Sequence, residues 1–190
     1  KFNNPDKSFA KSYYEGMRYG EIWGYTVDGY FLSDEEAANY PVDQTIVNSI
    51  INASAGTEKG LRAGDLKYID LNGNNKIDNG DNTVDNPGDR RIIGNKQPRY
   101  QYGANFGFNW YGFDFSVFFQ GVLKRDYSFG TEPYFWGASG TGQWQAACFE
   151  EHLDYWREDN QDAYYPKVYF NNNKNMRTQS RYIVDASYIR

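Results

Sequence analysis

The sequence predicts an all-β fold with long loops that contain short helices. Its 190 residues include 18 Tyr, 13 Phe and 5 Trp, so that aromatic residues make up 19% of the chain. The mean hydropathy is nevertheless only −0.85, and the chain also contains 19 Gly. Aromatic residues favour strands, whereas glycine and asparagine favour turns. This combination indicates β-strands joined by extended, polar, turn-rich loops.

The strongest strand pattern lies in residues 99–121, RYQYGANFGFNWYGFDFSVFFQG. Aromatic residues and one alanine occupy every second position from Tyr100 to Trp110, and small or polar residues fill the positions between them. After Tyr111-Gly112 a second stretch alternates in the same way, interrupted at Phe118. A repeat of two residues is the mark of a strand. The sequence therefore predicts a hairpin with its turn at Tyr111-Gly112.

The alternation by itself fits two environments for the apolar face of this hairpin. One is the core of a soluble sandwich and the other is lipid. The apolar face is almost wholly aromatic near the turn, and the opposite face is small or polar. These two features favour a lipid-facing hairpin whose other face lines a wet or plugged lumen, with the short turn on the periplasmic side.

A capping box and an oxygen-rich loop characterise residues 32–98, which are predicted as one long loop region. Ser33 and Glu36 have the spacing of a capping box, so a short helix is expected to start there and to end before Pro41.

Residues 70–81, DLNGNNKIDNGD, have the spacing of a calcium loop. The predicted calcium ligands are side-chain oxygens and one backbone carbonyl, from Asp70, Asn72, Asn74, Lys76 (carbonyl), Asp78 and Asp81. Asn75 stands where such loops carry glycine, and asparagine enters the left-handed region more readily than most residues. Three carboxylates are few, so the loop predicts a weak structural Ca²⁺ site with a dissociation constant of about 10⁻⁴–10⁻³ M. The alternative is a metal-free loop held by Asx-type hydrogen bonds.

Charge and composition argue against several other classes of function. A net charge of −5 and a pI near 4.9 do not suit a nucleic-acid partner, which requires a basic surface. Cys148 and His152 are the single cysteine and the single histidine. Four residues apart, they leave little material for a zinc site or a nucleophile–base pair, and His152 is expected to pack or to lie at the surface. No catalytic residues are predicted, and we expect no enzyme activity.

Short motifs that follow one another in order resemble the C-terminal part of the SusC/RagA family of TonB-linked receptors. They are GDLKYIDLNGN at 64–74, IIGN at 92–95, YG at 102–103, GFD at 112–114, VFFQG at 117–121 and DASYIR at 185–190. The resemblance covers nearly the whole chain. The main departure is Asn74-Asn75, where the family usually has Asp-Gly.

The resemblance implies a segment of a large antiparallel transmembrane β-barrel in the outer membrane of a Gram-negative bacterium. It also implies import of oligosaccharides or peptides, energised by TonB through an N-terminal part upstream of this chain. A SusD-like surface lipoprotein would act as the lid. Residues 1–190 would then be one barrel segment, with extracellular loop regions at 32–98 and 128–180, the hairpin at 99–121, a return strand in the second loop region, and the start of a further strand at 186–190.

Aromatic residues of the second loop region are candidates for stacking on a sugar, because that region would face the lid and the cargo. The candidates are Tyr134, Trp136 and Trp144, and ordinary loop packing is the alternative for each. A function from another class also remains open, namely a soluble, calcium-stabilised carbohydrate-binding module. In such a module the aromatic face of the hairpin would be part of the core.

Overall fold

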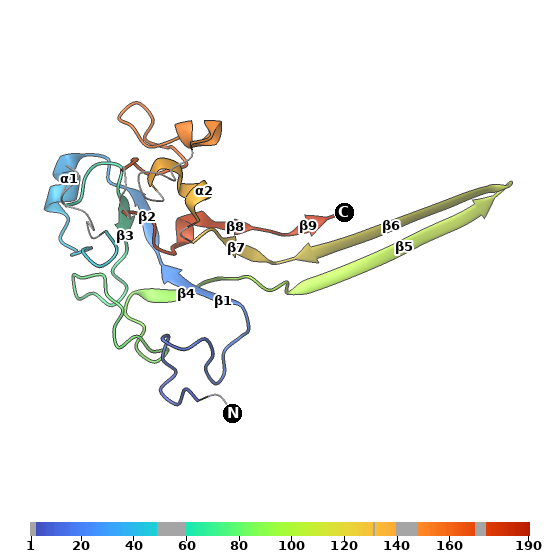
Figure 1. Cartoon of the computed structure of the whole chain (residues 1–190), viewed down its shortest axis with the longest axis horizontal. Helices are drawn as coiled ribbons and strands as arrows, with labels where there is room; N and C mark the ends of the chain where they lie inside the picture. The colour runs from blue at the N-terminus through green and yellow to red at the C-terminus, as the bar shows by residue number, and fades with distance from the viewer. Residues whose placement is uncertain (1–2, 49–59, 131, 140–147, 170–173) are drawn as a thin grey trace.

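A long hairpin projects from a globular part formed by the rest of the chain (Figure 1). The structure is a computed structural model, and it describes residues 3–48, 60–130, 132–139, 148–169 and 174–190. The hairpin consists of β5 (Tyr100–Trp110) and β6 (Phe113–Leu123). All pairings between the strands of the described residues are antiparallel.

The N-terminal strands pair with strands that follow much later in the sequence. β1 (Glu21–Tyr25) pairs with β4 (Arg90–Asn95), and β2 (Val27–Tyr30) pairs with β3 (Leu66–Tyr68). Residues 32–98, predicted as loop, therefore contain two strands. β3 has only three residues, too few for an alternation to be recognised, and its partner lies on the other side of α1.

The helix α1 (Asp34–Asn39) forms where the capping box predicted it, and the chain leaves the helix at Tyr40. The Glu36 N–H donates to Ser33 Oγ at 3.1 Å, but the Glu36 carboxylate accepts from the Leu32 N–H at 2.8 Å, one residue before the N-cap. A hydrogen bond from the Lys67 ammonium, together with the Leu32 N–H, lowers the pKa of Glu36. The start of the helix is thus held to β3.

The C-terminal half returns beside the base of the hairpin (Figure 1). β7 (Asp126–Ser128) pairs with β8 (Ile183–Asp185), and β9 (Tyr188–Ile189) pairs with the end of β6. β8 begins at Ile183, beyond the region 128–180 in which a return strand was predicted. The short helical elements are α2 (Pro133–Trp136) and 3₁₀ turns at Gly137–Ser139, Glu150–Leu153 and Ser180–Tyr182.

Aromatic rings and their hydroxyl groups form much of the core of the globular part. The hydroxyl groups of Tyr30 and Tyr182 both donate to the carbonyl of Tyr164, at 2.8 and 2.9 Å. Burial of a hydroxyl is tolerated where it finds such an acceptor. Tyr182 also packs edge-to-face against Trp136, with ring centroids 5.2 Å apart. These contacts join β2 to the second loop region.

A buried ion pair joins two distant segments. Lys174 Nζ lies 2.8 Å from Asp65 Oδ2, and both side chains are fully buried. The side-chain amide of Asn175 donates to the other oxygen of Asp65 at 3.0 Å. Charges are tolerated in a protein interior when they are paired and hydrogen-bonded in this way. The pair holds the start of β3 to residues 174–175.

Candidate membrane-facing hairpin and loop sites

The register of the hairpin gathers its apolar residues on one face. Residues directly opposite each other in an antiparallel pair share a face. Trp110 pairs with Phe113, Phe108 with Phe115, and so on to Tyr100 with Leu123, without a slip. Phe108 and Phe115 stack with ring centroids 5.1 Å apart. The hairpin predicted from the alternation is confirmed: β5 spans Tyr100–Trp110 as predicted, and β6 extends to Leu123, two residues beyond the predicted end at residue 121.

The turn at Tyr111-Gly112 is of the tight, two-residue kind. Both residues have positive φ, 47° for Tyr111 and 85° for Gly112. A type I′ turn requires positive φ at both central positions, and its twist matches that of the strands. Nothing lies within 4 Å of the place where a Cβ of Gly112 would stand. The glycine is therefore required by its backbone conformation and not by crowding.

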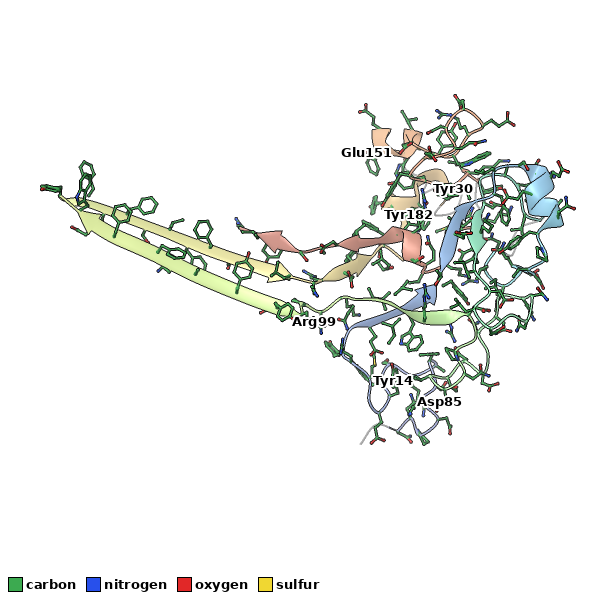
Figure 2. The ribbon with its side chains drawn as sticks, turned by 180° about the vertical axis from the view of Figure 1, so that it is seen from behind. Tyr14, Tyr30, Asp85, Arg99, Glu151 and Tyr182 are labelled. Carbon is green, nitrogen blue, oxygen red and sulfur yellow. The ribbon has the colours of Figure 1, made fainter. Side chains whose placement is uncertain are left out.

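The apolar face of the hairpin is uncovered in the described part of the chain. Phe106 is 60% exposed and Phe113 is 74% exposed. Both strands extend away from the globular part, so their side chains have no core to join (Figures 1 and 2). Large contiguous apolar surfaces of this kind mark contact with another protein or with a membrane.

The opposite face of the hairpin carries mostly small and polar side chains. Asn105, Gly107 and Asn109 of β5 lie across from Phe118, Ser116 and Asp114 of β6. Phe118, which interrupts the alternation, lies on this face, and its ring covers Gly103 at van der Waals distance, 3.6 Å from an added Cβ. An aromatic ring over a glycine of the neighbouring strand is a known way to protect the strand.

The calcium-type loop is closed by hydrogen bonds from its own backbone. The carboxylate of Asp70 accepts from the N–H groups of Asn72, Gly73 and Asn75, at 3.1, 2.7 and 2.7 Å. Partial desolvation would raise the pKa of Asp70, but these N–H groups lower it below its usual range. Asn75 has φ of 61°, as expected for the position that usually carries glycine.

The other predicted ligands are engaged in similar contacts. Asn74 donates from its side-chain amide to Asp78 Oδ2 at 3.0 Å, which brings these two side chains together. The Asp81 carboxylate instead accepts from the Asn86 side chain at 2.9 Å. Among the described residues, no group of three or more His, Cys, Asp or Glu side chains is placed so that it could hold a metal ion. The side-chain oxygens fit Ca²⁺ in chemical type, and calcium binding stays a prediction.

Asp89 is a residue of this loop that the sequence did not single out. Its side chain is fully buried, and its two oxygens accept from the N–H groups of Leu71 and Asp78 at 2.8 Å each. It therefore holds together the two ends of the 70–78 stretch. Asp89 lies beyond residues 70–81, so the loop spacing alone gave no signal for it.

The three candidates for sugar stacking lie in different environments. Tyr134 is 72% exposed, whereas Trp136 is only 6% exposed and donates from its indole N–H to the Gly130 carbonyl at 2.7 Å. Trp136 is a member of the core, in agreement with the alternative of ordinary loop packing, and sugar stacking stays a prediction. Trp144 lies outside the described residues.

His152 has a packing role. It is buried, its Nδ1 accepts from the Phe149 N–H at 2.9 Å, and its Nε2 lies 3.1 Å from the Phe135 carbonyl. An accepting Nδ1 requires the proton to be on Nε2, which can then donate to that carbonyl. The Nε2 hydrogen bond joins the 3₁₀ turn Glu150–Leu153 to α2, and the Nδ1 hydrogen bond closes the start of the turn at Phe149.

Among the residues that the structure describes, no helix is both long and apolar enough to cross a membrane.

Comparison with known proteins identifies relatives of one kind. No family model matches the chain. TonB-dependent receptor P39 of Formosa agariphila is 31% identical over 139 residues, which cover 63% of this chain and 12% of that protein. TonB-dependent receptor P3 of the same organism is 26% identical over 176 residues, which cover 93% of this chain and 14% of that protein. The chain thus spans only about an eighth to a seventh of the length of these curated relatives. Over the matched residues the chain is thus similar to a part of TonB-dependent receptors, which are outer-membrane proteins of Gram-negative bacteria.

Proposed function

We propose that the chain is a barrel segment of a TonB-dependent outer-membrane transporter of the SusC/RagA type. The whole protein would import oligosaccharides or peptides, energised by TonB and covered by a SusD-like surface lipoprotein. The order of motifs from 64–74 to 185–190 supports the SusC/RagA type. The single observation that carries the membrane assignment is the hairpin, whose aligned aromatic face is uncovered.

The dimensions of the hairpin support a membrane span. β5 has 11 residues, which at about 3.4 Å per residue extend about 37 Å. With the tilt of about 40° usual for barrel strands, the span along the membrane normal is about 28 Å. This is close to the apolar band of about 25 Å that such barrels present to lipid.

The orientation follows from the lengths of the connections. Barrels of this class have short turns on the periplasmic side and long loops outside. The two-residue turn after Trp110 would then be periplasmic. The globular part, including residues 70–81 and α2, would lie at the opposite end of the hairpin, on the extracellular side (Figure 1).

The edge of the hairpin also favours a larger sheet. Among the described residues β5 pairs only with β6, and β9 covers only the end of β6. Unpaired backbone groups are very costly in lipid, so spanning strands occur in closed barrels. We therefore propose that further strands of the full-length protein pair with both edges.

The proposal is tested by fractionation of the full-length protein expressed with its own leader. The expected result is an outer-membrane protein that migrates faster on SDS gels before boiling than after, as folded barrels do, and that co-purifies with a surface lipoprotein. Recovery in the soluble fraction as a carbohydrate-binding monomer would favour the soluble module instead. Growth of a receptor deletion strain on single oligosaccharides or peptides then identifies the cargo.

A further inference from the structure

An aromatic hollow lies beside α2 on the globular part. It encloses about 490 Å³. Its lining combines seven aromatic rings with one imidazole and two carboxylates, from Tyr127, Phe129, Glu132, Tyr134, Phe135, Phe149, Glu151, His152, Tyr164 and Tyr165. Glu151 projects from the side of the globular part that lies away from Asp85 (Figure 2). The hollow is distinct from the calcium-type loop and from the hairpin.

The floor of the hollow is held by packing. Phe129 and Phe135 stack in parallel with centroids 4.2 Å apart, and Phe135 contacts Tyr165 at 5.3 Å. His152 is fixed by its two hydrogen bonds to backbone groups. Tyr134 and Phe149 are exposed at the rim. A ligand would thus meet a packed aromatic floor and exposed aromatic side chains at the entrance.

The charge of the hollow has one sign. Glu132 and Glu151 both line it, and no lysine or arginine among the described residues does. Neither carboxylate forms an ion pair with a lysine or arginine of the described residues. Desolvation raises the pKa of Tyr165, and the charge of Glu151 is among the further causes that raise it. Burial and the charge of Glu151 thus act together on Tyr165, whereas burial raises the pKa of the neighbouring Tyr164 and the positive charge of Arg181 lowers it.

We propose that this hollow binds an organic cation, an ammonium or guanidinium group carried by the cargo. The face of an aromatic ring attracts a cation, and the attraction grows when the cation loses water. The two carboxylates would add an attraction that a neutral sugar does not share. The inference rests on the proposed function only in assigning the cation to a cargo that arrives from outside the cell.

The test compares two compounds of the same shape, choline and its neutral analogue 3,3-dimethylbutan-1-ol, titrated into the full-length receptor by calorimetry. Choline should bind about tenfold more tightly than the alcohol, because only the cation interacts with the ring faces and carboxylates. Glu132→Gln and Glu151→Gln should each weaken choline binding several-fold and leave the alcohol unaffected. Tyr134→Ala should also weaken the binding of choline. Glu158→Gln is the matched control, an exposed glutamate outside the hollow.

The inference is overturned if the receptor binds the two compounds with equal affinity, or if the two glutamate variants bind choline like the Glu158→Gln control. It is also overturned if choline does not bind at tens of millimolar. The titration is made on whichever cell fraction holds the folded protein. A folded outer-membrane barrel without preference for choline overturns this inference alone. A soluble protein overturns the proposed function, and its choline titration still decides whether the hollow takes a cation.

Discussion

Replacing Phe106 with arginine would place a charge in the middle of the proposed lipid-facing surface. Phe106 lies across from Val117 on the apolar face and contacts the ring of Phe119, with centroids 6.2 Å apart. It lies four residues before Trp110, the last residue of β5. Four residues correspond to about 14 Å along a strand, and to about 10 Å of depth at the usual tilt.

The expected free-energy cost follows from this depth. With Trp110 at the periplasmic edge of a band of about 25 Å, Phe106 lies close to its midplane. An arginine there costs about 2–4 kcal/mol of folding free energy in a barrel, and one near the interface costs about 0–1 kcal/mol. Phe106→Arg should therefore be far more destabilising than Trp110→Arg. Asn105→Arg, on the polar face, should cost little.

The assay is reversible urea unfolding of the full-length receptor and its variants in lipid vesicles, followed by tryptophan fluorescence. Asn105→Arg is the matched control, because it introduces the same charge on the adjacent residue. In a soluble sandwich, both aromatic residues would belong to the core and would be comparably costly to replace. Similar large losses at Phe106 and Trp110 would refute the lipid-facing assignment.

Three further predictions concern the turn, the loop and the buried ion pair. Gly112→Ala should destabilise the receptor by about 1–2 kcal/mol, because φ at this position is 85°; Gly107→Ala, in extended backbone, is its control, and equal effects would exclude the turn as the cause. Millimolar Ca²⁺ should raise the melting temperature of the wild-type protein and not that of Asp70→Asn; an unchanged wild-type melting temperature would contradict the calcium site. Lys174→Met should cost about 3–5 kcal/mol because it leaves the Asp65 carboxylate buried without its cation. Adding Asp65→Asn should recover part of that loss in the same unfolding assay, and no recovery would show that the pair is not the cause.

The hairpin and α1 could be predicted from the sequence because their signals are local. The alternation around Phe106 extends over the 11 residues of β5 and continues along β6 up to its interruption at Phe118. The spacing of Ser33 and Glu36 is contained in one helical turn. In both cases the residues that decide the structure are close neighbours in sequence. The structure of the hairpin agrees with the predicted one, including the two-residue turn at Tyr111-Gly112.

The packing of the loop regions could not be predicted, because it depends on partners far away in sequence. β3 pairs with β2 across the intervening α1, and Lys174 reaches Asp65 from 109 residues away. Trp136 has the same sequence character as an exposed loop aromatic, but its burial is decided by contact with Tyr182. Asp89 likewise accepts hydrogen bonds from residues 71 and 78 of a loop that ends before it in the sequence.

The most direct test of the membrane assignment is the lipid contact of two adjacent residues. Cys148, which is free and exposed, is first replaced by serine, and a cysteine is then introduced at position 106 or 105 of the full-length receptor. The variant is labelled with an environment-sensitive fluorophore and reconstituted into vesicles with brominated lipid tails, which quench fluorophores in contact with them. A lipid-facing hairpin predicts strong quenching of the label in Phe106→Cys and weak quenching in Asn105→Cys, because neighbouring strand residues point to opposite faces. Equal quenching at both positions, or stronger quenching at position 105, would contradict it.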